Sequence, residues 1–222
     1  MTGHIGAQDP HELFEVVTAA GIGTGQRKPR YAVHRDGDWH RAIHVWLVCH
    51  DGDGQPCLVF QRRGLQKDTW PGYLDATVGG HVRAGERLQD TLRETEEEIG
   101  LTVEPERLRW LGVRISVTER EPDLRDRELQ DVFLVISETP LTGLRPNPAE
   151  LEGVVSVPID GVLALFAGER EAVEGMELGV ARCELQPVKV HLADFIPSVD
   201  RYPYRMAIAA RRVLHGERHV AI

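Results

Sequence analysis

The chain has 222 residues, of which 41% are hydrophobic and 27% are charged, a balance that excludes a fibrous, low-complexity or wholly disordered protein. Its 26 Lys and Arg residues against 35 Asp and Glu residues give a net charge of −9, so we expect neither a nucleic-acid polymer nor a membrane as the main partner. No apolar run approaches the roughly 18 residues of a membrane helix, and three cysteines without a C-x-x-C pair predict a reducing, cytoplasmic setting.

Strand and helix patterns are mixed along the chain. Apolar runs predict strands at 13–17, 42–49, 57–60, 108–117, 129–136 and 154–157, with a turn at 51–55. Helical spacing predicts helices at 87–99, 159–166 and 206–214. This order predicts a mixed α/β fold in which a sheet lies between helices.

The composition also predicts the domain limits. We expect a loose segment at 1–12, a main domain at 13–167 and a C-terminal extension at 168–222 that packs on or beside it, and the glycine-rich stretch 168–179 is the best candidate for a linker. The extension could cap a substrate pocket or form a dimer contact, and its aromatic residues, such as Phe195 and Tyr202, fit core packing better than stacking on a ligand. A monomer and a homodimer both remain open.

The segment RETEEEIG, residues 93–100, carries the strongest chemical signal. On a helix, Glu94, Glu97 and Glu98 stand at i, i+3 and i+4 and share one face. Carboxylates gathered in this way repel one another unless a cation lies between them. Magnesium prefers oxygen ligands and commonly bridges substrate phosphates, so this face suits phosphate chemistry. An isolated E-x-x-E-E pattern is more often a solvated acidic surface, so the surrounding sequence is needed to distinguish such a surface from a metal-binding face.

Residues 79–101 read GGHVRAGERLQDTLRETEEEIGL. This stretch resembles the signature of the Nudix hydrolases, G-x5-E-x7-R-E-U-x-E-E-x-G-U, in which U is apolar. Gly80 and Glu86 have the family's spacing, and the second half agrees at Arg93, Glu94, Glu97, Glu98, Gly100 and Leu101. The resemblance implies a Nudix fold, a mixed β-sheet sandwiched between helices, here with a C-terminal extension.

The resemblance also implies roles for particular residues. In this family the helix glutamates hold Mg²⁺ or Mn²⁺, the equivalent of Glu94 often acts as the general base, and the arginine at Arg93 braces the glutamates. The carbonyl of Gly79 often completes the metal site, and a glutamate from a later loop frequently joins it. Glu150, in the segment NPAELEGVV, is our candidate for that glutamate.

Two positions depart from the family pattern. Six residues separate Glu86 from Arg93 where the family has seven, and Thr95 stands where an apolar residue is usual. We expect the missing residue to shorten the loop or the first turn of the helix, which leaves the placement of Glu86 open.

A second resemblance runs from about Phe14 to Val157. The segments HRDGDWHRAIHVWL, QRRGLQKDTWPGYLDATVGGHVRAGE and RELQDVFLV resemble the branch of Nudix hydrolases related to isopentenyl-diphosphate isomerase. In the isomerase a catalytic cysteine stands at the position of Gly79, and its paired E-x-E glutamates correspond to Leu129 and Asp131, with Glu128 out of register. Because the thiol that moves a proton at the substrate carbon is absent, isomerisation is the weaker alternative.

The same branch contributes expectations for histidines and basic residues. His34, His40 and His81 resemble the isomerase's metal-binding histidines; a structural or surface role is the simpler interpretation, and a second metal stays open. Arg30, Arg63 and Lys67 correspond to residues that hold the diphosphate, so we name these three and His81 as candidate substrate-binding residues. Solvated surface positions remain the alternative for the basic residues.

The sequence therefore predicts a Mg²⁺-dependent Nudix hydrolase, with Mn²⁺ as an alternative ion. Its expected substrate is a small phosphorylated compound: a nucleoside di- or triphosphate, or a nucleoside diphosphate linked to another group. Two alternatives remain, an isomerase-like activity and a Nudix domain that binds a ligand without catalysis; the second is less expected because such domains commonly lose the glutamates that this chain keeps.

Overall fold

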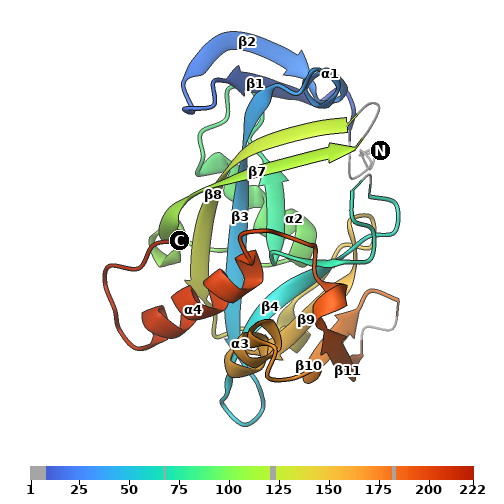
Figure 1. Cartoon of the computed structure of the whole chain (residues 1–222), viewed down its shortest axis with the longest axis vertical. Helices are drawn as coiled ribbons and strands as arrows, with labels where there is room; N and C mark the ends of the chain where they lie inside the picture. Colours follow the sequence, from blue (N-terminus) through green and yellow to red (C-terminus); the bar gives the residue numbers. More distant parts are fainter. Residues whose placement is uncertain (1–8, 68, 121–123, 182–183) are drawn as a thin grey trace.

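Figure 1 shows the fold in a computed structural model, which describes the chain except residues 1–8, 68, 121–123 and 182–183. Cys183 and most of the predicted loose segment 1–12 lie outside the described residues. The strands are β1 (Leu13–Val17), β2 (Gly23–Pro29), β3 (Trp39–His50), β4 (Pro56–Arg63), β5 (Leu74–Asp75), β6 (Val78–His81), β7 (Arg109–Arg120), β8 (Leu124–Ile136), β9 (Leu151–Pro158), β10 (Ala172–Gly179) and β11 (Leu185–His191). The helices are α1 (Arg30–Asp36), α2 (Arg93–Ile99), α3 (Ile159–Ala167) and α4 (Tyr202–Leu214).

The described strands form one sheet organised around the long strand β3. The path runs β11-β10-β9-β4-β3-β1-β2, while β5 pairs with β4, β6 and β8 pair with β3, and β7 pairs with β8. Only the pairing of β3 with β8 is parallel among these strand pairs. Because β6 pairs with residues 42–45 of β3 and β8 pairs with residues 39–48, the segment that precedes α2 and strand β8 flank the same part of β3.

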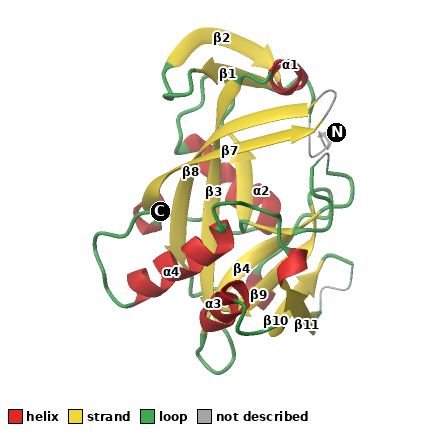
Figure 2. Cartoon of the chain, in the orientation of Figure 1, coloured by secondary structure: helices red, strands yellow, loops and turns green. Residues whose placement is uncertain are grey.

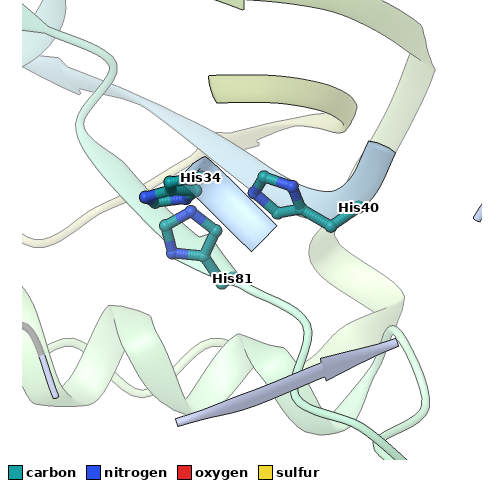
Figure 3. Close-up of side chains that lie close together, drawn as sticks. All are labelled: His34, His40 and His81. Atoms are coloured by element: carbon teal, nitrogen blue, oxygen red, sulfur yellow. The ribbon is translucent and has the colours of Figure 1, made fainter. Parts of the chain in front are cut away.

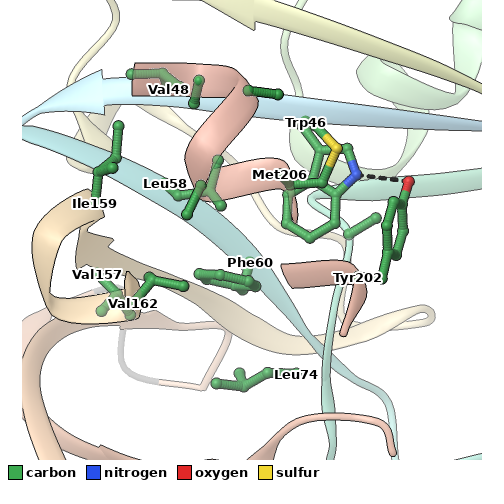
Figure 4. Packing of buried hydrophobic residues seen from close by; sticks show 14 of the residues in the cluster. Trp46, Val48, Leu58, Phe60, Leu74, Val157, Ile159, Val162, Tyr202 and Met206 are labelled. Atoms are coloured by element: carbon green, nitrogen blue, oxygen red, sulfur yellow. Dashed lines mark hydrogen bonds between the residues drawn. The ribbon is translucent and has the colours of Figure 1, made fainter. Parts of the chain in front are cut away.

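The side chains of β3 alternate between two apolar cores. Trp46 and Val48 pack with residues of α3 and α4 (Figure 4), whereas Val45 and Leu47 pack with Ile99 of α2 on the other face. This period of two is the one expected of a strand that is buried on both faces. The predicted class, a mixed sheet between helices, is confirmed, and Figure 2 shows the helices on both sides of the strands.

The structure corrects two of the predicted elements. The helix predicted at 87–99 begins only at Arg93 and follows a 3₁₀ turn at Asp90–Leu92. The carboxylate of Asp90 accepts hydrogen bonds from both the backbone N–H (3.1 Å) and the guanidinium of Arg87, and such local bonds compete with helix formation. The stretch 168–179, predicted as a linker, contains strand β10, which pairs with β9 and β11.

The other predicted strands and helices are present, although their ends differ by several residues. The turn predicted at 51–55 is closed by Asp51, whose carboxylate accepts the backbone N–H groups of Asp53 and Gln55. No helix of the described residues has the length and apolar content that crossing a membrane would require.

Candidate active site

The glutamate face lies on the short helix α2, whose C-terminal end is held in place by its last residue and by the residue that follows. Ile99 is buried in the core, and Gly100 ends the helix with a left-handed φ of 66°, a conformation that glycine adopts without strain. Thr95, at the position where an apolar residue was expected, is 2% exposed, and its hydroxyl donates to the carbonyl of Leu92 at 2.8 Å. The hydroxyl is therefore satisfied locally, and Thr95 fills an apolar position without an unpaired polar group.

Arg93 holds the carboxylates of this face in place. Its Nη1 donates to Glu94 at 2.6 Å and to Glu97 at 2.8 Å, and its Nε donates to Glu86 at 3.0 Å. The second carboxylate oxygen of Glu86 accepts the backbone N–H of Arg83 at 3.0 Å. The shortened loop thus places Glu86 against Arg93, where it supports the arginine that supports the helix glutamates.

Gly80 makes room for Glu94. A Cβ at Gly80 would lie 2.3 Å from Cγ of Glu94, too close for two non-bonded carbon atoms, so any larger residue here would displace the Glu94 side chain. Burial raises the pKa of Glu94 to about 7, although Arg93 acts to lower it. The carboxylate is thus held at the edge of the sheet, between β6 and its own helix.

Glu98 is the most deeply buried carboxylate of the helix. It is 4% exposed, and its Oε2 has no hydrogen-bond partner. Burial raises its pKa well above the ordinary value; Lys67 opposes this shift, while the charges of Glu94 and Glu150 add to it. A buried carboxylate oxygen without a partner carries a large desolvation cost. The arrangement fits a hard divalent cation held by Glu98, Glu94 and Glu97.

Glu150 and Lys67 lie beside Glu98, on loops that flank the sheet. The ammonium of Lys67 pairs with the carboxylate of Glu150, and the carbonyl of Glu150 accepts the N–H of Gly64 at 2.9 Å. The structure therefore brings the predicted loop glutamate to the helix glutamates, with a cation next to it.

The other predicted basic residues also line this region, but each has a protein partner. Arg63 donates to Asp75 at 3.0 Å and to the carbonyl of Thr69 at 3.0 Å, and Arg30 lies 3.1 Å from Nδ1 of His81. Arg30, Arg63, Lys67 and the glutamate face line one cavity of about 1030 Å³. Residues 196–200 of the C-terminal extension form part of its wall.

His34, His40 and His81 lie close together, as Figure 3 shows, and His81 also lines the cavity. They come from α1, β3 and β6, and their ring nitrogens all approach within 4.8 Å of one another. Phe14 stacks on two of them, with centroid distances of 5.2 Å to His40 and 4.7 Å to His81. Burial lowers the pKa of His34 and of His81 to about 3. A surface role is therefore excluded for His34 and His40, which are both buried.

Two carboxylates face these histidines from β8. His40 Nε2 lies 3.5 Å from Oδ1 of Asp126, His34 Nε2 lies 3.7 Å from the same oxygen, and His81 Nε2 lies 3.0 Å from Oε1 of Glu128. The Nδ1 of His40 is 3.2 Å from the carbonyl of Asp38, so it carries the hydrogen and Nε2 of the neutral ring presents a lone pair. That lone pair and the Asp126 oxygen, both acceptors, lack a hydrogen-bond partner.

Acceptors that converge without a donor fit a bound cation. Ligands about 2.1 Å from a metal and roughly at right angles are about 3 Å apart, close to the spacings seen here. The backbone carbonyl at Nδ1 of His40 is the kind of outer partner that fixes a metal-binding tautomer. A set of three imidazoles and two carboxylates suits Zn²⁺ or Mn²⁺ better than Mg²⁺.

The sequence analysis placed this acidic pair at the wrong residues. Leu129 and Asp131 were assigned to the E-x-E positions, but both lie on the opposite face of β8, where Asp131 accepts from Arg41 at 2.5 Å. The strand begins at Leu124 rather than near 129, and Glu128 pairs with His40 in the parallel register. The D-x-E spacing of Asp126 and Glu128 was the signal that could have found the pair.

The comparisons with known proteins identify the family. A sequence model described as the NUDIX domain matches residues 40–176. Because this match covers more than half of the chain, the protein belongs to the Nudix family.

Several relatives carry hydrolase names. The chain is 35% identical over 153 residues to Nudix hydrolase 3 of Arabidopsis thaliana, a match covering 67% of this chain and 19% of that protein. It is 31% identical over 137 residues to an uncharacterised Nudix hydrolase of Clostridium acetobutylicum, covering 60% of this chain and 64% of that protein. It is 33% identical over 140 residues to the isopentenyl-diphosphate Delta-isomerase of Cutibacterium acnes, covering 61% and 67%. The chain thus matches less than two thirds of the first two relatives.

Solved structures share the fold. DR0079 from Deinococcus radiodurans matches with a TM-score of 0.50 and 23% identity, over 71% of this chain and 90% of that one. A MutT/nudix family protein from Enterococcus faecalis matches with a TM-score of 0.50 and 14% identity, over 79% and 62%. At these identities the likeness concerns the fold alone.

Proposed function

We propose that this protein is a hydrolase that uses a divalent cation, Mg²⁺ or Mn²⁺, to cleave a phosphoanhydride bond. The substrate class is a nucleoside di- or triphosphate, or a nucleoside diphosphate linked to another group. The observation that carries the proposal is Oε2 of Glu98, a buried oxygen without a hydrogen-bond partner. The charges of Glu94 and Glu150 act on the same carboxyl, and all three glutamates line a cavity that also has basic residues. The hydrolase names of the relatives support the reaction class.

Each residue of the site has a distinct role in the proposed reaction. Glu94, Glu97 and Glu98, with the carbonyl of Gly79 and Glu150, would hold the cation, which lowers the pKa of bound water and offsets phosphate charge. Water attacks phosphorus, the anhydride P–O bond breaks, and the leaving phosphate takes the bond electrons. Glu94 would accept the proton of the attacking water. Arg93 keeps the carboxylates in position, and Arg30, Arg63 and Lys67 would hold phosphate oxygens.

A glutamine substitution with a matched control tests this proposal. Glu98→Gln keeps the shape of the side chain but removes the charge, whereas Glu96→Gln changes an exposed glutamate of the same helix. We expect Mg²⁺-dependent release of products from one class in a panel of nucleoside di- and triphosphates, nucleotide sugars and dinucleotides. Glu98→Gln should lower that rate by about 100-fold or more, and Glu96→Gln should leave it within about twofold.

Other outcomes would contradict the proposal in distinct ways. Full activity of Glu98→Gln would contradict the assignment of the glutamate face as the metal site. Isomerised isopentenyl diphosphate, added to the same panel, would favour the activity named for the Cutibacterium relative. Tight nucleotide binding without turnover would favour a Nudix domain that only binds a ligand.

We further propose that His34, His40, His81, Asp126 and Glu128 hold a second divalent transition-metal ion. The unpartnered acceptors at His40 Nε2 and Asp126 Oδ1, which face each other at 3.5 Å, support this site. The ion would organise the cavity wall next to Arg30 and increase the positive charge that meets the substrate.

Metal content measures this second site directly. Protein purified without chelators should contain about one equivalent of Zn²⁺ or Mn²⁺ by elemental analysis, and His40→Gln should lower it at least tenfold. His50→Gln, at an exposed position of the same strand, is the matched control. Equal metal content in His40→Gln and the control would contradict the site.

A further inference from the structure

His44 lies in the wall of the cavity that also contains the proposed metal ligands Glu98 and His81. It belongs to β3, where it pairs with Gly79 of β6, and it lines the cavity although it is only 8% exposed. Neither cluster of candidate ligands includes it. A buried imidazole that reaches the substrate cavity has two ring nitrogens, and the partner of one determines what the other can do.

The Nδ1 side of His44 faces a hydrogen-bond relay from the C-terminal helix. Trp46 Nε1 donates to the hydroxyl oxygen of Tyr202 at 2.8 Å, a bond drawn in Figure 4, and the same hydroxyl lies 3.3 Å from Nδ1 of His44. An indole N–H can only donate, so the Tyr202 oxygen accepts from it. The phenolic hydrogen then needs an acceptor, because Tyr202 is buried, and Nδ1 is the acceptor within reach among the described residues.

This relay fixes the tautomer of His44. If Nδ1 accepts from Tyr202, the neutral ring carries its hydrogen on Nε2. The opposite tautomer would leave the phenolic hydrogen of Tyr202 buried without an acceptor, which costs free energy. His44 is therefore set up as a hydrogen-bond donor at Nε2.

The Nε2 edge of the ring is open toward the cavity. A Cβ on Gly79 would lie 3.5 Å from Nε2 and Cδ2 of His44 and 3.9 Å from the amide nitrogen of Gln61, so glycine leaves room beside this edge, with the Gln61 amide as a neighbour. Within the described part of the chain no hydrogen bond joins Nε2 to another group. The two nearby guanidinium groups have partners of their own, Arg63 with Asp75 and Arg114 with Asp200.

The position of this donor indicates what it would bind. Gly79, which pairs with His44, is followed by Gly80, whose added Cβ would meet the side chain of Glu94, so the Nε2 edge lies next to the glutamate face. The basic residues Arg63 and Lys67 line the same cavity. The surroundings of Nε2 therefore favour one ligand atom, an oxygen of a diphosphate bound at the glutamates.

We propose that His44 is a substrate-binding residue whose Nε2–H donates to a phosphoryl oxygen of a bound diphosphate, and that Tyr202 is the positioning residue that fixes this hydrogen. The inference rests on the proposed phosphoanhydride substrate. It assigns to the C-terminal helix a part in the site that neither metal cluster requires.

The tautomer can be measured on the unaltered protein. Ring ¹⁵N NMR of histidine-labelled protein, with His44 assigned from the signals lost in His44→Gln, should show a protonated Nε2 and an unprotonated Nδ1. Tyr202→Phe removes only the hydroxyl, and the His44 signals should then shift toward a mixture of tautomers. Protonated Nδ1 in the unaltered protein, or an unchanged His44 spectrum in Tyr202→Phe, would overturn the proposal.

Diphosphate binding tests the donor itself, with inorganic diphosphate and Mg²⁺ as the probe in calorimetry. The amide nitrogen of His44→Gln can take the place of Nε2, whereas that of His44→Asn reaches only the place of Nδ1. We expect His44→Asn to weaken the Kd about tenfold and His44→Gln to weaken it no more than about threefold. Equal affinities for His44→Asn and the unaltered protein would overturn the assignment.

These measurements separate the two proposals. If the chain binds diphosphate in a manner that depends on His44 but hydrolyses no nucleotide, the proposed function fails and the assignment of His44 stands. If Mg²⁺-dependent hydrolysis is present but His44→Asn binds diphosphate normally, the reverse holds.

Discussion

The absence of a side chain at Gly80 determines where the carboxylate of Glu94 can lie. The Cβ of an alanine there would be 2.3 Å from Cγ of Glu94, so the side chain or the helix would have to move by about 1 Å. A displacement of that size in a catalytic group typically costs about 100-fold in rate. We expect Gly80→Ala to lower kcat/KM by about that factor, with little loss of stability.

Gly52→Ala is the control for this substitution, because nothing lies within 4 Å of the Cβ it would add. Turnover of a nucleotide substrate found in the panel is the measurement. Wild-type kcat/KM in Gly80→Ala would show that Glu94 does not have to stay at its observed position.

Individual residues also show what the sequence could and could not predict. The spacing of Glu94, Glu97 and Glu98 sufficed to place them on one face, because helix geometry is local. The pairing of Asp126 and Glu128 with His40 depends on the register of β8 against β3. A strand register shifted by an odd number of residues exchanges the two faces, which is why Leu129 and Asp131 were assigned wrongly.

At the scale of elements, the hairpin of β3 and β4 holds two thiols opposite each other, Cys49 and Cys57. Burial raises the pKa of Cys49 to about 11 and that of Cys57 to about 12. Thiolate is the reactive form, so we expect neither thiol to react with iodoacetamide at pH 8 while the protein is folded. Mass spectrometry of the alkylated peptides, with and without urea, is the measurement; labelling of either residue in the folded state would contradict the burial.

The same shifts set a pH dependence of stability. Above about pH 9 the unfolded chain loses its thiol protons while the folded chain keeps them, so the folded state binds more protons and the free energy of unfolding falls as pH rises. We expect Tm to fall between pH 8 and pH 10.5, and to fall less in the double variant Cys49→Ala/Cys57→Ala. Parallel Tm profiles of the two proteins would be inconsistent with this linkage.

Helix α2 shows the limit of periodicity as a signal. Leu88 and Leu92 continue the apolar spacing toward the N-terminus, so the sequence predicted a helix from residue 87. In the structure Leu88 is outside the helix but still packs on the core that contains Ile99. Apolar spacing reports which residues face the core, and side-chain bonds such as that of Asp90 to the backbone of Arg87 determine whether they do so from a helix.

For the whole molecule, the C-terminal extension is continuous with the core. Strands β10 and β11 lengthen the central sheet, and Val190, Phe195 and Met206 belong to the same apolar cluster as Trp46. Sequence alone could predict the helix at 206–214, but not that its apolar side would close one face of β3. That packing joins residues about 160 positions apart, and no local pattern encodes it.

A substitution at Met206 tests whether the extension folds separately from the main domain or shares one hydrophobic core with it. The Met206 side chain is fully buried, so Met206→Ala should lower the free energy of unfolding by about 2–5 kcal/mol, whereas Arg211→Ala, on the exposed side of the same helix, should change it by no more than about 0.5 kcal/mol. Urea unfolding followed both by tryptophan fluorescence and by circular dichroism is the measurement. Because Trp46 packs against this helix, a single core requires both signals to shift together in Met206→Ala. Two transitions, of which only the first moves, would instead show that the main domain folds without the extension.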